Sequence, residues 1–266
     1  MTAEGTTVDV PALLRASGIR KDYGHVRALD GVDFDVRPRE IHALVGDNGA
    51  GKSTLIKIIA GTVRPDAGTI EIDGQPVMFN SPHDAREAGI ETVYQDLALA
   101  DPLDAAENVF LGREVCYPGF LGWLGFVDRA SMRRRTQEHL RELAVNLPSI
   151  TVPVENFSGG QRQAVAVARA AVWGQRLVIM DEPVAALGVQ QTTQVLDLMQ
   201  RTRDEKGLSI ILISHNLPEV LRVADRITVL RLGRRVGTVA ARDATATLLV
   251  GAMTGAVTSL DERSPA

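Results

Sequence analysis

Apolar and polar residues alternate along two segments in the first part of the chain. Val32, Phe34 and Val36 are separated by charged residues, and the same period of two recurs at Ile70 and Ile72. This period is typical of strands that bury one face and expose the other. The pattern therefore predicts an antiparallel sheet near the amino terminus.

Three other apolar runs show no alternation and occupy Ile41–Val45, Leu177–Met180 and Leu208–Ile213. Continuous apolar strands are expected in a parallel sheet, because helices cover both of its faces. These runs predict the core sheet. Each run is far shorter than the roughly 18 residues needed to cross a bilayer, so we expect no membrane-spanning segment.

Helical segments with recognisable ends lie between the strands. Ser81–Pro82 opens one segment, Gly207 closes the segment that begins near Val189, and Asp128 caps a segment that reaches Ala144. The last belongs to a mainly helical insertion at about residues 96–155. We expect one folding unit over residues 12–255, ending with a helical segment at 244–253, and loose tails at 1–11 and 256–266.

The composition indicates which partners and which cellular compartment to expect. With a net charge of −4 and a pI of about 5.8, the 266-residue chain has no basic surplus for a nucleic-acid backbone, and we expect no nucleic-acid partner. The one cysteine, Cys116, excludes an intrachain disulfide and favours a reducing compartment. Because the first residues lack a basic and apolar signal, we expect a cytoplasmic protein.

A glycine-rich loop follows the first apolar run. Residues 46–54 read GDNGAGKST and fit the pattern G-x-x-x-x-G-K-[ST] between a buried strand and a helix. Backbone N–H groups of such a loop surround phosphate oxygens. We expect Lys52 to reach the β- and γ-phosphates and Ser53 to bind Mg²⁺, so ATP and Mg²⁺ are the predicted cofactors. The predicted nucleotide-binding residues of this loop are Gly46, Asp47, Asn48, Gly49, Ala50, Gly51, Lys52, Ser53 and Thr54.

Two adjacent carboxylates, Asp181 and Glu182, end the second apolar run. Successive residues at the end of a strand point in different directions. Asp181 can therefore approach the metal while Glu182 faces the γ-phosphate and polarises the attacking water. Together with the glycine-rich loop, this pair predicts ATP hydrolysis.

The segment at residues 156–163, NFSGGQRQ, resembles the LSGGQ signature of ABC ATPases, with Phe157 in place of the usual leucine. At the start of a predicted helix over 158–172, it forms an anion-binding cap. The resemblance implies an α/β P-loop NTPase core with a parallel sheet, an antiparallel β-subdomain and an inserted helical subdomain. It also implies that the cap binds the γ-phosphate held by a second subunit, through Ser158, Gly159, Gly160 and Gln161.

Further residues match that family one at a time. Tyr23 matches the aromatic residue that stacks on adenine, Gln95 the glutamine near Mg²⁺ and the attacking water, and His215 the switch histidine at the γ-phosphate. Gly188 departs from the family, because an aspartate usually stands at its position in the D-loop. A glycine makes no carboxylate contact across a dimer, so communication between two ATP sites is expected to differ here.

With only one nucleotide-binding unit, the chain is expected to work as a dimer, most simply with a second copy of itself. A transport ATPase then docks separate transmembrane permease subunits beside the insertion, on the cytoplasmic face of the membrane. A soluble ABC protein that acts on DNA or ribosomes is the alternative. Such proteins usually carry a long coiled-coil insertion or two nucleotide-binding units, which this sequence lacks, so transport is the favoured interpretation.

Residues 93–99, 108–114 and 181–189 resemble the ATPases of bacterial monosaccharide importers of the ribose, fructose and xylose type. The resemblance extends over residues 12–255 and implies import of a sugar delivered by a solute-binding protein. Another small solute, or an exporter, remains the alternative. An aromatic and glycine-rich patch at 117–126 is open to two interpretations, packing under a loop or contact with the membrane subunits.

Overall fold

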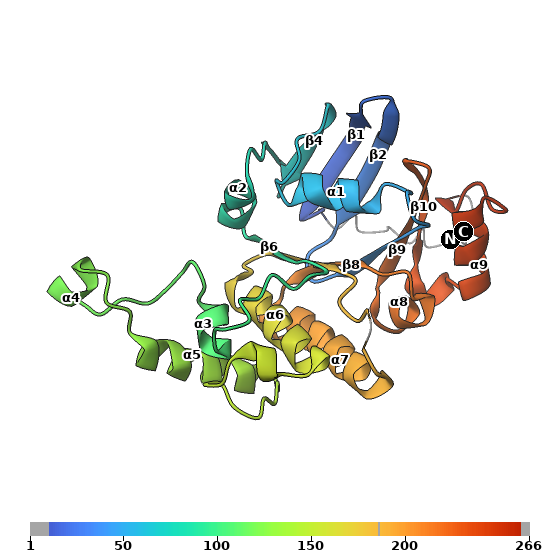
Figure 1. Ribbon diagram of the computed structural model, residues 1–266. Coiled ribbons are helices and arrows are strands. Elements are labelled where there is room, and N and C mark those ends of the chain that lie inside the picture. Colours follow the sequence, from blue (N-terminus) through green and yellow to red (C-terminus); the bar gives the residue numbers. More distant parts are fainter. Residues whose placement is uncertain (1–10, 186, 262–266) are drawn as a thin grey trace, which may run out of the picture.

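The computed structural model describes residues 11–185 and 187–261 (Figure 1). Most of the predicted amino-terminal tail and residues 262–266 lie outside these ranges. The predicted antiparallel sheet is present, with strand order β2-β1-β4-β5. Val32, Phe34 and Val36 of β2 are buried, as their spacing predicts. The four strands are β1 (Leu14–Tyr23), β2 (Val26–Val36), β4 (Ala67–Ile72) and β5 (Gln75–Val77).

The core sheet has the order β10-β9-β3-β8-β7-β6. Its neighbours pair in parallel except β10, which forms an antiparallel hairpin with β9. The three apolar runs form β3, β7 and β8 at its centre, as predicted. The six strands are β3 (Ile41–Val45), β6 (Ile90–Val93), β7 (Leu177–Asp181), β8 (Ser209–Ile213), β9 (Arg226–Arg231) and β10 (Arg234–Ala240).

Alternate residues of the core strands enter two different apolar layers, since neighbouring side chains of a strand point to opposite faces. Ile41 and Val45 of β3 pack with α6 (Gly159–Trp173) and α7 (Val189–Lys206) on one face. Leu44 packs on the other face with α1 (Lys52–Ile59) and the antiparallel sheet. Figure 1 shows these layers above and below the sheet.

The insertion contains one long helix, α5 (Arg129–Glu142), and the short helices α3 (Ala105–Val109) and α4 (Phe120–Trp123). Asp128 caps α5 as predicted, because its carboxylate accepts from Ser131 N at 2.9 Å. Figure 1 shows α4 projecting away from the body of the molecule. The remaining helical elements are α2 (Pro82–Glu87), α8 (Leu217–Val223), α9 (Ala246–Thr254) and the 3-10 turns Val154–Asn156 and Ala241–Asp243.

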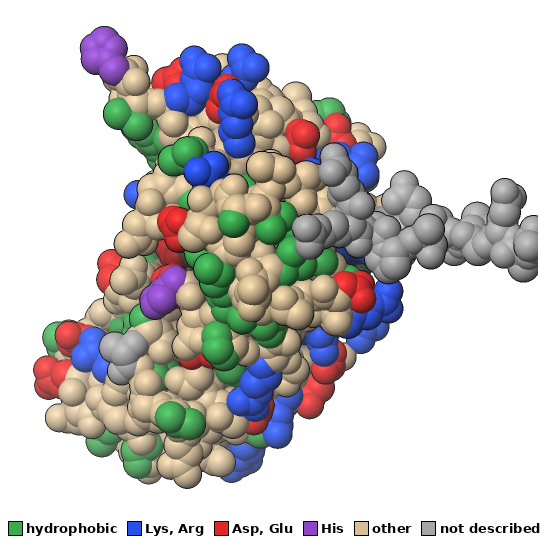
Figure 2. Space-filling view, turned by 90° about the vertical axis from the view of Figure 1, so that its right-hand side faces the viewer, with side chains coloured by type: hydrophobic (Ala, Val, Ile, Leu, Met, Phe, Trp, Pro, Cys, Tyr) green, Lys and Arg blue, Asp and Glu red, His purple; other side chains and the backbone are tan. Residues whose placement is uncertain are grey.

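The segment after α9 differs from the expected loose tail up to residue 261. Leu260 is buried in the apolar layer around α9, and its N–H bonds to the Val236 carbonyl of β10 at 3.3 Å. Asp261 accepts from Arg235 at 2.8 Å. These contacts attach residues 260 and 261 to β10. Figure 2, seen from the side of the molecule where α9 lies, shows hydrophobic side chains in the middle of this face and acidic and basic side chains mainly toward its edges.

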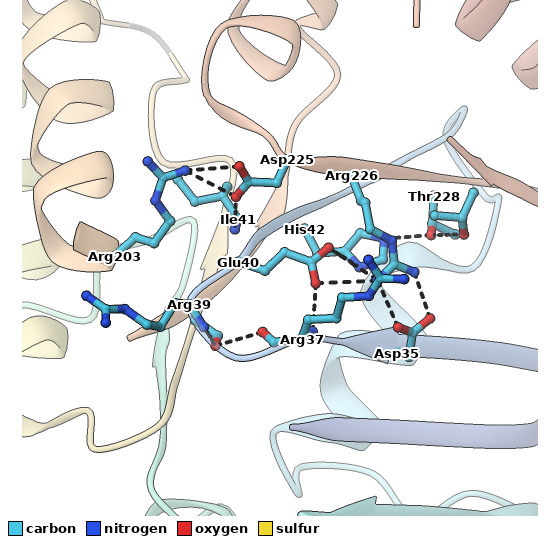
Figure 3. A network of polar contacts seen from close by, with 12 residues as sticks. Asp35, Arg37, Arg39, Glu40, Ile41, His42, Arg203, Asp225, Arg226 and Thr228 are labelled. Carbon is cyan, nitrogen blue, oxygen red and sulfur yellow. Dashed lines mark hydrogen bonds and ion pairs between the residues drawn. The ribbon is translucent and has the colours of Figure 1, made fainter. Parts of the chain in front are cut away.

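A polar network joins the two sheets at the amino end of β3 (Figure 3). Arg226 of β9 donates two hydrogen bonds to Asp35 of β2, at 2.8 and 2.9 Å, and lies 3.3 Å from Glu40. His42 is fully buried, and its Nε2 lies 2.8 Å from Thr228 Oγ1. This network fixes the antiparallel sheet to the core at the edge opposite the glycine-rich loop.

His42 makes the stability of this network sensitive to acid. Burial and the Arg226 charge lower the pKa of His42 from 6.5 to about 3. Its folded pKa lies below its unfolded value, so its contribution to stability is complete above pH 6.5 and is lost as the pH falls toward 3. The charge of Asp35 opposes this lowering of the pKa of His42.

We expect the stability advantage of the natural chain over His42→Gln to shrink by about 2 kcal/mol between pH 7.5 and pH 5. In this interval the unfolded histidine binds a proton and the folded one does not, whereas glutamine does not titrate. Urea unfolding of both proteins at the two pH values measures the difference. An advantage that does not change with pH would contradict a neutral, buried His42.

Candidate active site

The glycine-rich loop connects β3 to α1 and is packed tightly against its neighbours. A Cβ atom at Gly46 would lie 2.3 Å from the Leu230 carbonyl oxygen, and one at Gly51 would lie 2.6 Å from that of Ala28. Gly51 also has a φ of 103° at the N-cap of α1. Only glycine fits these two positions. The loop is thereby fixed with the amino end of α1 directed at the site.

Lys52 lies across this loop and is almost completely buried. Its Nζ donates to the carbonyl oxygens of Gly46 at 2.7 Å and Asp47 at 3.0 Å. Burial lowers the pKa of Lys52, while the carboxylates of Glu182, Asp47 and Asp181 oppose that shift. The ammonium group is therefore held at the loop, beside the acids that end β7.

The three residues predicted to bind metal line one open cleft of about 760 Å³. Ser53, Gln95 and Asp181 come from α1, the loop after β6 and the end of β7. Burial raises the pKa of Asp181, and the neighbouring Glu182 raises it further. A divalent cation would favour the ionised form of this acid. A hydroxyl, an amide oxygen and a carboxylate are ligands that suit Mg²⁺ together with phosphate oxygens.

Glu182 and His215 meet because β7 and β8 are neighbouring parallel strands whose carboxyl ends lie at the same edge. The N–H of Glu182 bonds to the Ile213 carbonyl at 2.9 Å, and Glu182 Oε1 lies 2.9 Å from His215 Nδ1. Glu182 has a φ of 51°, a left-handed conformation that costs a non-glycine residue about 1–2 kcal/mol. The strained backbone turns this carboxylate toward the histidine.

Glu219, in the first turn of α8, is an acid at this site that the sequence reasoning missed. Asn216 Nδ2 donates to its Oε1 at 2.6 Å, whereas its buried Oε2 has no hydrogen-bond partner among the described residues. Burial raises the pKa of Glu219, the charge of Glu182 raises it further, and His215 opposes the shift. An acid four residues after a candidate histidine was the available signal.

Ser158 of the signature segment is the N-cap of α6 and forms a capping box with Gln161. Ser158 Oγ accepts from the Gln161 N–H at 3.3 Å, and Gln161 Oε1 accepts from the Ser158 N–H at 2.9 Å. A Cβ atom at Gly160 would lie 2.8 Å from Gln191 of α7, so glycine permits the close contact of α6 with α7. Ser158, Gly160 and Gln161 line a cavity of about 470 Å³.

That cavity is separate from the cleft of Ser53, Gln95 and Asp181, because the two share no lining residue. The structure therefore brings the glycine-rich loop, the predicted metal ligands, Glu182 and His215 together, and leaves the signature apart from them. Gly188 is the N-cap of α7, beside the signature, and its N–H donates to Gln191 Oε1 at 3.2 Å.

Tyr23 ends β1 on the antiparallel sheet and is 47% exposed. Lys21 Nζ lies 5.7 Å from the centre of its ring. The exposed ring is available for stacking on a base. Within residues 11–185 and 187–261, no cluster of three or more His, Cys, Asp or Glu side chains suits a metal, and no helix has the length and apolarity to span a bilayer.

Comparison with known proteins gives consistent results. The family model described as ABC transporter matches residues 29–185. The chain is 53% identical to the fructose import ATP-binding protein FrcA of Rhizobium meliloti, covering 92% of this chain and 94% of that protein. It is 47% identical to the xylose/arabinose import ATP-binding protein XylG of Sulfolobus acidocaldarius, covering 84% and 86% of the two chains.

Solved structures resemble the fold at lower sequence identity. An ATP-binding cassette of an ABC transporter in its ADP conformation gives a TM-score of 0.75 at 23% identity, over 91% of this chain and 95% of that chain. A dimeric ATP-binding cassette in a post-hydrolysis state, bound to ADP and Pi, gives a TM-score of 0.71 at 24% identity, over 87% and 100%. Both share the architecture of the present chain.

Proposed function

Because this chain belongs to the ABC transporter family of ATP-hydrolysing subunits, we propose that it energises the import of a monosaccharide through separate membrane subunits. The single observation that carries the sugar assignment is the 53% identity to a fructose import ATP-binding protein over 92% of this chain and 94% of that protein. The α/β fold and the site geometry agree with ATP hydrolysis.

In the proposed reaction, Lys52 and the backbone of residues 46–54 hold the phosphates of ATP. Ser53, Asp181 and Gln95 would hold Mg²⁺, which neutralises charge on the phosphate oxygens when bound. Glu182 orients and polarises the attacking water. His215, held 2.9 Å from Glu182 Oε1, contacts the γ-phosphate from the neighbouring strand.

A second copy of the chain completes each site in this proposal. The signature cap lies in a cavity of its own, so it has to reach the γ-phosphate bound to another subunit. The N–H groups of Gly159 and Gly160 lie at the amino end of the 15-residue helix α6, where the helix dipole favours an anion. ATP therefore holds two copies together, and hydrolysis lets them separate.

The permease subunits are proposed to dock in a groove of about 300 Å³ between the core sheet and the insertion. Tyr94, Leu111 and Arg113 line it together with Trp173 at the end of α6. Arg113 pairs with Glu91 and lies 4.8 Å from the Trp173 ring. A groove walled by both core and insertion is suited to transmit a movement of one to the other.

The aromatic patch at 117–126 extends beyond this groove. Packing under a loop is not what the structure shows, because Phe120 is 70% and Trp123 is 79% exposed. Their rings stack on each other, with centres 5.8 Å apart. The exposed patch supports the other interpretation, a contact with the membrane subunits on the cytoplasmic face of the membrane.

Reconstitution with its permease in liposomes tests the transport assignment. We expect ATP hydrolysis to rise several-fold when a solute-binding protein loaded with its monosaccharide is added, and the labelled sugar to accumulate only with ATP. A binding protein without sugar is the control. Equal hydrolysis with and without sugar, and no accumulation of any monosaccharide offered, would contradict sugar import.

A further inference from the structure

The loop that carries Gln95 contains a strained turn. Leu97 has a φ of 60° and Ala98 a φ of 45°, and two consecutive non-glycine residues rarely adopt this left-handed conformation. The turn is closed by a bond from the Leu97 N–H to the Tyr94 carbonyl at 2.9 Å. Such a turn persists only where its surroundings hold it in place.

Arg169 of α6 supplies that support. Its guanidinium donates to the Ala98 carbonyl at 2.8 Å through Nη1 and to the Leu97 carbonyl at 2.9 Å through Nη2. The side chain is partly buried and makes no ion pair with any described carboxylate. The two N–H donors of its planar guanidinium therefore bind the carbonyl oxygens of the two residues in the strained turn.

The same stretch of chain is attached at its other end as well. Arg162, about two helical turns before Arg169 on the same side of α6, pairs with Asp101. Asn108 is completely buried and bonds to both the N–H and the carbonyl of Ala100, at 2.8 and 3.0 Å. Residues 97–101 thus run along α6 with little freedom to move.

We propose that Arg169 is a positioning residue that holds Gln95 at the metal cleft, and that through it α6 links this cleft to the signature cap. The inference rests on the proposed function, because it assigns Gln95 to the reaction. Helix α6 begins at the Ser158 cap and continues without interruption past Arg169 to Trp173. A displacement of the cap by the partner's γ-phosphate therefore reaches Gln95 of the same chain through one rigid helix.

Two variants and a control test this role. Arg169→Gln removes the paired donors, and the double variant Arg169→Gln with Ala98→Gly also makes the left-handed conformation easy to adopt. Arg176→Gln is the control, because Arg176 follows α6 and pairs with the exposed Asp73. Each protein is assayed as the purified full chain for kcat and KM of ATP hydrolysis with Mg²⁺, and for thermal unfolding.

We expect Arg169→Gln to lower kcat by roughly 10- to 100-fold, since a small misplacement of a reacting group has effects of this size. KM for ATP should change by less than about threefold, because the phosphate-binding loop is untouched. Ala98→Gly should restore part of the lost kcat. An unchanged kcat, or a loss that Ala98→Gly does not relieve, would overturn the proposal, because a packing defect at Arg169 would be indifferent to the backbone of residue 98.

Hydrogen exchange without nucleotide separates this inference from the proposed function. Arg169→Gln should speed the exchange of the N–H groups of residues 95–101 whether or not the chain hydrolyses ATP, while Arg176→Gln should leave it unchanged. Unaltered exchange would overturn the positioning role even in an active ATPase. If exchange accelerates but the natural chain shows no hydrolysis with Mg²⁺ and ATP, the proposed function fails and the attachment of the loop to α6 stands.

Discussion

Glu182→Gln is expected to lower kcat for ATP hydrolysis by at least about 100-fold, the lower end of the range for losing a general base. Glutamine keeps the size of the side chain but cannot accept a proton from water. The bond from the Glu182 N–H to Ile213, at 2.9 Å, is made by the backbone and survives the change. ATP should therefore still bind, and the ATP-bound dimer should accumulate because hydrolysis no longer opens it.

Steady-state phosphate release and size-exclusion chromatography with ATP measure these two effects. Glu205→Gln is a matched control, since Glu205 is exposed near the end of α7, just before the amino end of β8, whereas the site lies at the carboxyl ends of β7 and β8. The control should hydrolyse ATP as the natural chain does. If Glu182→Gln turned over ATP at the natural rate, another group would have to act on the water.

Lys52→Ala should weaken ATP binding by roughly 10- to 100-fold, the equivalent of losing one charge-assisted hydrogen bond of about 1.5–3 kcal/mol. The ammonium group already bonds to the carbonyls of Gly46 and Asp47, so it is placed to meet the phosphates. Its removal also takes one of the neighbouring cations away from Asp181 and Glu182, and leaves Lys57 near Asp181. Electrostatic repulsion of the phosphates should then add to the loss.

Calorimetric titration with ATP measures the affinity, and thermal unfolding without nucleotide shows whether the loop still folds. Lys206→Ala is the control, because Lys206 forms a surface pair with Glu142 at the end of α7. An ATP affinity equal to that of the control would contradict the assignment of Lys52 to the phosphates.

The parts of the fold that depend on apolar periodicity were predictable. The alternation around Phe34 and the continuous run Ile41–Val45 fall on strands of the expected kinds, and the caps Asp128 and Ser158 start the expected helices. The strands β6, β9 and β10 were not predicted. They are short or carry several polar residues, so their place in the sheet depends on neighbours far along the chain.

The candidate site was predictable where one stretch of sequence contains the whole pattern, as around Lys52. Contacts between distant segments were not. Glu182 and His215 were each assigned to the γ-phosphate from the sequence. The 2.9 Å contact between the two side chains follows from the order of the strands and was not predicted. Arg169 interrupts an apolar face of α6, and this polar position was a usable signal. Its partners, the carbonyls of Leu97 and Ala98, lie about 70 residues away in the sequence and could not be predicted from the residues around it.

The ion pairs between Arg226 and Asp35 have a consequence for how ATP is received. They fix the sheet that carries Tyr23 to the sheet that carries the glycine-rich loop, so in the proposed complex the base and the phosphates contact two sheets that are joined to each other. Little binding free energy is then lost to ordering two halves of a site. In the proposed dimer, the contacts of ATP with the second copy of the chain are then available to drive closure.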